Sequence, residues 1–104
     1  MPQGPPPEYV ARYRSFIRDF PDYNIRPTQH AYQRMAEHAV TSTHIRRVLR
    51  RGVLRHVERD IGTGLDRYRV AGHDADGRAL EVVFNLDDTR NGRVVVITVI
   101  APGR

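Results

Sequence analysis

Histidine and arginine are the residue types in this sequence whose spacing best suits chemistry on a bound ligand. His30, Arg34 and His38 recur every four residues, so they would lie along one flank of a helix. Histidine gives and takes protons near neutral pH, and the arginine fork binds phosphate or carboxylate groups. The pattern indicates acid–base chemistry on an anionic ligand, although a solvated helix flank repeats charges in the same way.

Metal-dependent chemistry is a poor match for the same residues. The chain has no cysteine, which excludes thiolate metal sites, disulfide bonds and cysteine nucleophiles. His30 and His38 would lie about 12 Å apart along a helix axis, which is too far for them to share one metal ion. The sequence also lacks a phosphate loop, a dinucleotide glycine fingerprint and a His-Glu-x-x-His zinc motif. We therefore expect neither a metal nor another cofactor.

The remaining polar residues suit cleavage of RNA without a metal. A ribonuclease that uses the RNA 2′-hydroxyl as its nucleophile needs a general base, a general acid and cations for the developing phosphorane charge. His30 is the candidate base or acid, and Arg34 and Arg67 are candidate phosphate ligands. Further proton or hydrogen-bond contacts are assigned to three residues of the predicted sheet: Tyr68, Glu81 and Thr98. Each also has a structural interpretation, as a core tyrosine, a solvent-facing acid and an ordinary strand residue.

The charge of the chain indicates an acidic partner. Net charge is +5 and all 17 basic residues are arginine, although a GC-rich genome would produce the same bias. A basic chain attracts nucleic acid through long-range electrostatics. Four clustered arginines are candidates for contacts with RNA phosphates: Arg46, Arg47, Arg50 and Arg51. Arginines in the last turn of a helix also stabilise it through its dipole, without any ligand.

Three helices are predicted before the sheet. Apolar residues follow one helical face over residues 8–20, and Pro21 ends that helix. Residues 21–27 are expected to be an irregular connector. A second helix is predicted over residues 28–39, and a third from about Thr41, which caps it, to Gly52. We expect Gly52 to end the third helix in left-handed geometry.

Four strands are predicted after Gly52, over residues 53–60, 65–72, 79–86 and 94–100. In the first strand, Val53, Arg55, Val57 and Arg59 alternate with Leu54, His56 and Glu58. Turns are expected at residues 61–64, 73–77 and 87–92, and His73 beside the second turn is expected to be exposed. The last strand is apolar on both faces and is expected in the interior of the sheet. Tight turns favour an antiparallel meander, so the expected fold is α+β, with three N-terminal helices on one face of a four-stranded sheet.

The length and ends of the chain favour one folded domain. Residues 1–7 are rich in proline and are expected to form a disordered lead-in, followed by a single α+β domain over residues 8–101. No apolar run approaches the ~18–20 residues needed to cross a bilayer, and the N-terminus does not resemble a signal peptide. We therefore expect a cytoplasmic protein without a membrane partner.

Several short motifs follow one another in a characteristic order. His30-Ala-Tyr-Gln-Arg34-Met is followed by Val40-Thr41 and by Val48-Leu49 with Gly52. Three later segments are Tyr68-Arg-Val, Leu80-Glu-Val-Val and Val96-Ile-Thr-Val. This set resembles the domain of unknown function 4258 family, over about residues 28–101. That family is similar in layout to the RelE and BrnT ribonuclease toxins of toxin–antitoxin systems.

The resemblance implies a helix-plus-antiparallel-sheet fold and RNA cleavage. Carried over by position, the helix histidine and arginine of the family fall on His30 and Arg34, and its fourth-strand threonine falls on Thr98. The chain has Glu81 where the family often has histidine. The first hypothesis is a toxin-like, metal-independent endoribonuclease that an acidic antitoxin protein neutralises.

Two other functions are open at the level of sequence. One is a non-catalytic RNA-binding or ribosome-associated module that uses the clustered arginines. The other is a protein-interaction domain, such as a homodimer formed through the fourth predicted strand or the N-terminal helix.

Overall fold

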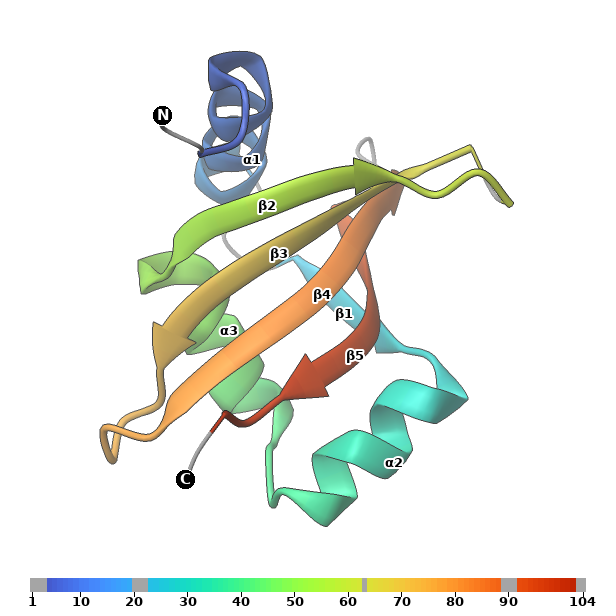
Figure 1. Cartoon of the computed structure of the whole chain (residues 1–104). Helices are drawn as coiled ribbons and strands as arrows, with labels where there is room; N and C mark the ends of the chain where they lie inside the picture. The colour runs from blue at the N-terminus through green and yellow to red at the C-terminus, as the bar shows by residue number, and fades with distance from the viewer. Residues whose placement is uncertain (1–3, 20–22, 63, 89–91, 103–104) are drawn as a thin grey trace.

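The computed structural model describes residues 4–19, 23–62, 64–88 and 92–102, and it has three helices and a five-stranded sheet within these ranges (Figure 1). The helices are α1 (Pro7–Asp19), α2 (Gln29–Glu37) and α3 (Ser42–Arg51). The strands are β1 (Asn24–Pro27), β2 (Val53–Arg59), β3 (Asp66–His73), β4 (Ala79–Asp88) and β5 (Arg93–Ile100). Parts of the predicted lead-in (1–3), the first helix end (20–21) and two turns (63 and 89–91) lie outside the described residues.

The predicted α+β class and the three helices are confirmed, but the purely antiparallel four-stranded sheet is wrong. The sheet has the order β1-β5-β4-β3-β2, and β1 pairs in parallel with β5. The prediction missed β1, part of the expected connector, because four residues with the burial pattern of an edge strand carry no clear period. β5 therefore lies between two strands, as its apolar sequence predicted.

The two central helices begin at threonine caps. Thr28 and Thr41 each accept a hydrogen bond from the backbone N–H three residues later, at Ala31 and His44. The His44 ring also accepts a hydrogen bond from the Thr41 N–H (3.0 Å), so the cap is reciprocal. α2 ends earlier than expected because Ala39 adopts a positive φ of 54°. The end of α2 is therefore set by backbone geometry that its side-chain pattern did not indicate.

Gly52 ends α3, but not in the left-handed geometry that we predicted. Its φ is −80° and its ψ is −177°, which any residue can adopt. A Cβ at Gly52 would lie 2.5 Å from the Val48 carbonyl oxygen and 2.6 Å from the Ala71 carbonyl oxygen. Glycine is required here because the end of α3 approaches the β3 backbone closely.

A bulge in β2 overturns the predicted alternation of that strand. Leu54 pairs with Val70 and His56 pairs with Arg69, so Arg55 is an extra residue between them. The extra residue reverses which side chains face the core. Leu54 and Val57 therefore pack inward, whereas His56 faces the opposite side of the sheet.

The three helices build one core with the sheet and leave its other face open. In Figure 1, α3 passes behind β3 and β4, and α2 lies beside β5. Buried side chains from α1 and α3 meet those of the strands, and the Tyr13 and Phe84 rings lie 5.9 Å apart. None of the described helices is long and apolar enough to cross a membrane. The face of the sheet that turns away from this core is called the outer face below.

Candidate functional site

The histidine–arginine flank of α2 does not meet the polar residues of the sheet. The His30 side chain is exposed and makes no hydrogen bond or ion pair with another described residue. The Arg34 guanidinium donates to Glu37 of the same helix at 3.0 Å. The backbone carbonyl of His38 accepts a hydrogen bond from Arg78, which ties the β3–β4 hairpin to the end of α2. The predicted pairing of His30 and Arg34 with sheet residues is therefore not seen in the described structure.

Tyr68 belongs to the core rather than to a polar site. Its side chain is 2% exposed, and its ring stacks on that of Phe84 at a centroid distance of 5.5 Å. Burial raises the pKa of the Tyr68 hydroxyl, which interacts with the Arg12 side chain. Tyr68 thus follows the structural interpretation that the sequence left open.

The four arginines of α3 face different ways and do not form one patch. Arg46 packs over the Tyr23 ring (4.7 Å to its centroid) and donates to the Tyr23 carbonyl at 2.9 Å, so its role is structural. Arg50 lies beside α1, in a hollow shared with Arg14 and Arg18. Only Arg47 and Arg51 of the four line the larger cleft described below. Arg47 and Arg51 are four residues apart and therefore lie on the same side of α3, and Arg46 and Arg50 lie on a different side.

On the outer face, one residue from each of four strands forms a row, and three of the four are polar. Strand register places His56 opposite Arg69, Arg69 opposite Val83, and Val83 opposite Thr98. Side chains in directly opposed positions have Cβ atoms about 4.5–5.5 Å apart. With the adjacent pair Glu58 and Arg67, these residues line a groove of about 200 Å³, the outer-face groove.

Each ionisable side chain of the outer-face groove has a polar or charged partner. His56 Nε2 lies 3.2 Å from Glu58 Oε1, and the Arg69 guanidinium lies 2.5 Å from Glu81 Oε1. Both Nε and Nη2 of Arg67 donate to Asp60 Oδ2, at 3.1 and 2.9 Å. The groove therefore holds a histidine–carboxylate pair beside two oriented guanidinium groups and the Thr98 hydroxyl.

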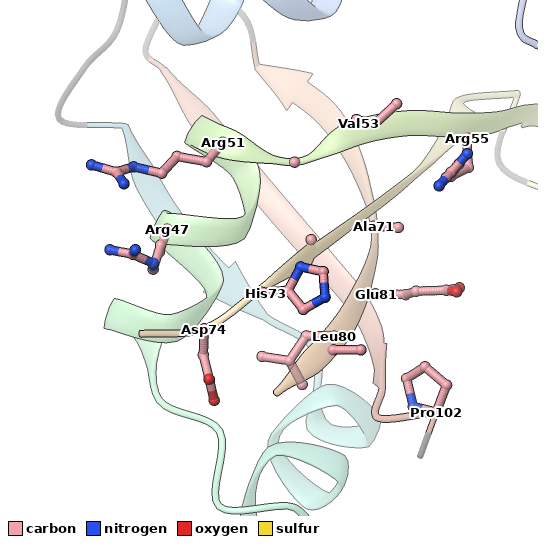
Figure 2. A pocket seen from close by; sticks show the side chains of 13 residues that line it. Arg47, Arg51, Val53, Arg55, Ala71, His73, Asp74, Leu80, Glu81 and Pro102 are labelled. Atoms are coloured by element: carbon pink, nitrogen blue, oxygen red, sulfur yellow. The ribbon is translucent and has the colours of Figure 1, made fainter. Parts of the chain in front are cut away.

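A larger cleft of about 450 Å³ lies where the end of α3 meets β2, β3 and β4 (Figure 2). We call it the edge cleft; six polar residues line it: Arg47, Arg51, Arg55, His73, Asp74 and Glu81. Figure 2 shows Arg47 and Arg51 on α3 at one side, and Arg55 and Glu81 on the strands at the other. His73 is exposed, as predicted, and lies between the two walls.

The two hollows divide the candidate residues of the sequence between them. Arg67 and Thr98 line the outer-face groove, Glu81 lines the edge cleft, and the Glu81–Arg69 pair connects the two. Within the described ranges, no group of three or more histidine or acidic side chains is placed to hold a metal ion. The arrangement suits proton transfer by His56 and Glu58 beside an anion held by guanidinium groups.

The candidate residues chosen from the sequence did not include His56, Glu58 and Arg69, which line the outer-face groove. The period of two in β3 places Arg69 on the same side as Arg67, so alternation was a usable signal there. No comparable signal existed for His56, because the β2 bulge reverses the alternation on which its assignment rested.

Comparisons with known proteins give a match to a family model, and it extends from α2 to β5. No curated protein and no solved structure gives a match to the chain. A family model described as domain of unknown function (DUF4258) matches residues 28–101, which confirms the expected resemblance. This region contains both α2 and α3 and the strands that line the outer-face groove and the edge cleft. The chain therefore belongs to the DUF4258 family.

Proposed function

We propose that this protein is a toxin-like, metal-independent endoribonuclease whose reaction centre is the outer-face groove. The observation that carries the proposal is the row of His56, Arg69 and Thr98 beside Glu58 and Arg67. It combines two proton-transferring groups, two cations and a hydroxyl on strands, which hold side chains more rigidly than loops do. This placement replaces His30 as the proposed centre.

The proposed reaction is attack of the RNA 2′-hydroxyl on the adjacent phosphorus. Glu58 accepts the 2′-hydroxyl proton while the 2′-oxygen–phosphorus bond forms, and protonated His56 gives a proton to the leaving 5′-oxygen as its bond to phosphorus breaks. Arg67 and Arg69 offset the charge of the phosphorane, and Thr98 donates a hydrogen bond to a phosphate oxygen. The products are a 2′,3′-cyclic phosphate and a 5′-hydroxyl.

The wider biological role follows from charge and from resemblance. A net charge of +5 attracts RNA, and it would equally attract an acidic antitoxin protein. The layout of the DUF4258 motifs, similar to that of RelE and BrnT toxins, supports a toxin-type fold and a cytoplasmic site of action as part of this proposal. A homodimer is not required by the proposed chemistry.

The test is incubation of the purified chain with total RNA in EDTA, beside three variants. His56→Ala is expected to lower the cleavage rate about 10²–10⁴-fold, the usual contribution of a general acid or base. Glu58→Gln is expected to lower it comparably, whereas His30→Ala should leave it unchanged. Circular dichroism melts confirm that each variant is folded, which is expected because both groove positions face solvent.

Two results would overturn the proposal in different ways. Cleavage that survives His56→Ala but disappears with His30→Ala would return the reaction centre to the flank of α2. Absence of cleavage by the wild-type protein, together with RNA binding that weakens steeply with salt, would indicate a non-catalytic RNA-binding module. That second function is favoured by one observation: three arginines of the edge cleft have no partner among the residues that the structure describes, as set out next.

A further inference from the structure

The edge cleft has more positive than negative side chains, and three of its arginine side chains form no polar contact within the described part of the fold. Among the described residues, the guanidinium groups of Arg47, Arg51 and Arg55 make no hydrogen bond or ion pair. They differ in this from Arg46, which is held by Tyr23. No carboxylate of the described residues offsets the charge of these three guanidinium groups, so they can bind an external anion without first breaking an ion pair.

The acids of the edge cleft do not neutralise these arginines, because each has another partner. Asp74 accepts hydrogen bonds from the Asp76 and Arg78 backbone N–H groups (both 2.9 Å) and from Arg78 Nε (3.0 Å). Glu81 is paired with Arg69, 2.5 Å away in the outer-face groove. The cleft therefore has arginines on both sides, Arg47 and Arg51 on α3 and Arg55 on β2, while its carboxylates are already paired.

Part of the cleft lining is apolar, and this part is called the floor here. Ala71, Ala79, Leu80 and Pro102 line it, and Gly72 contributes no side chain. Close packing of Gly52 against the Ala71 backbone brings the arginines of α3 to the edge of this floor. An apolar floor with guanidinium groups at its rim matches a ligand that has a base at one end and a phosphate at the other.

We propose that the edge cleft binds a ribonucleotide unit, with its phosphate on Arg47 and Arg51 and its base over the apolar floor. This inference deepens the proposed ribonuclease function. It rests on that function in one respect: the bound nucleotide is taken to be the one next to the cleaved phosphodiester linkage. Arg69 of the groove and Ala71 of the cleft are two residues apart on β3, about 7 Å. A bound strand thus passes from the groove into the cleft.

The direct test measures binding of adenosine 5′-monophosphate, adenosine and inorganic phosphate by NMR titration of the whole chain. The nucleotide is expected to bind more tightly than either half alone and to shift the amide signals of Ala71 and His73. Replacing both Arg47 and Arg51 by alanine is expected to weaken nucleotide binding about 10- to 100-fold, as loss of charge-assisted hydrogen bonds predicts.

A matched control separates this site from general charge attraction. Replacing Arg14 and Arg26 by alanine removes the same charge from α1 and β1, away from the cleft, and should leave nucleotide binding nearly unchanged. Equal weakening by the two double variants, or failure of the wild-type chain to bind the nucleotide, would overturn the proposal. Lysine at both cleft positions should restore binding in part, because it keeps the charge but loses the planar fork.

Cleavage kinetics distinguish failure of this inference from failure of the proposed function. His56→Ala should abolish cleavage but leave binding of adenosine 5′-monophosphate intact. The cleft double variant should raise KM for an oligoribonucleotide about 10-fold without lowering kcat, and should leave a dinucleotide substrate unaffected. A fall in kcat on the dinucleotide would contradict a separate subsite. Nucleotide binding at the cleft without any cleavage would refute only the proposed reaction.

Discussion

Gly52→Ala isolates the contact that holds the end of α3 against β3. The φ of −80° and ψ of −177° suit alanine, so the backbone conformation imposes no penalty. The added methyl group would instead meet the carbonyl oxygens of Val48 and Ala71 at 2.5 and 2.6 Å, and a Val70 side-chain carbon at 2.8 Å. Two of these three neighbours are backbone atoms, one in α3 and one in β3, so the backbone at the end of α3 must shift.

The size of the effect follows from two opposing terms. Overpacking of this kind destabilises the fold by about 1–3 kcal/mol. Replacing glycine also reduces the conformational freedom of the unfolded chain, which stabilises the fold by about 0.4–1 kcal/mol. Because backbone atoms yield less than side chains, we expect a net loss of about 1.5–2.5 kcal/mol in the free energy of unfolding. For a domain of this size, that lowers Tm by roughly 6–20 °C.

Thermal unfolding followed by circular dichroism measures this shift, with Gly62→Ala as the control. A Cβ at Gly62 would meet only an Asp60 carboxylate oxygen at 3.4 Å, an ordinary contact. Gly62→Ala should therefore change the free energy of unfolding by less than about 0.5 kcal/mol. Equal Tm values for the two variants would refute the close-approach argument. Gly52→Ala should also weaken nucleotide binding, since Gly52 lines the edge cleft.

Two further predictions concern pH. Burial raises the pKa of Tyr13 above its ordinary value near 10, so its neutral form stabilises the fold below that pH and the contribution is lost as pH rises above it. Tyr13→Phe removes the hydrogen bond to the Leu49 carbonyl and should lower the free energy of unfolding by about 1 kcal/mol at pH 7. In urea denaturation between pH 9 and 12, the free energy of unfolding of this variant should depend less on pH than that of the wild type. An unchanged slope would contradict this. Backbone and side-chain hydrogen bonds from Arg78 lower the pKa of Asp74, so its contribution is present above about pH 3.9 and is lost as pH falls below it. Asp74→Asn should be less stable at pH 7 and lose stability less steeply below pH 4 in the same assay, and equal steepness would count against that role for Asp74.

Local sequence patterns predicted the elements that carry strong periodic or capping signals. Helical spacing located α1, and the Thr41 cap located the start of α3. The predicted strand over residues 65–72 located β3, but it did not separate two candidate residues: Tyr68 is buried in the core, whereas Arg67 lines the outer-face groove. β1 carried no such signal, because a four-residue edge strand forms only when β5 is present to pair with it.

The composition of the candidate site could be predicted only in part. Arg67 was a candidate as a phosphate ligand, Glu81 interrupts an apolar strand, and Thr98 also matches the family's threonine by position. His30 and Arg34 were chosen for their spacing within one helix, yet the position of that helix relative to the sheet is a tertiary property. The arginines of α3 show the same limit, since the packing of Tyr23 makes Arg46 structural and leaves Arg47 and Arg51 at the cleft.

The positions of the three helices and of β2 to β5, the absence of thiol chemistry and the basic charge follow from local or additive properties, which a sequence carries directly. The groove and the cleft depend instead on long-range pairing. One extra residue in β2 turns His56 toward the outer face, and strand register then places it in the row of Arg69 and Thr98. The close approach of Gly52 to Ala71 sets the arginines of α3 beside the strands. These relations arise from contacts between residues far apart in the chain, and no local pattern specifies them.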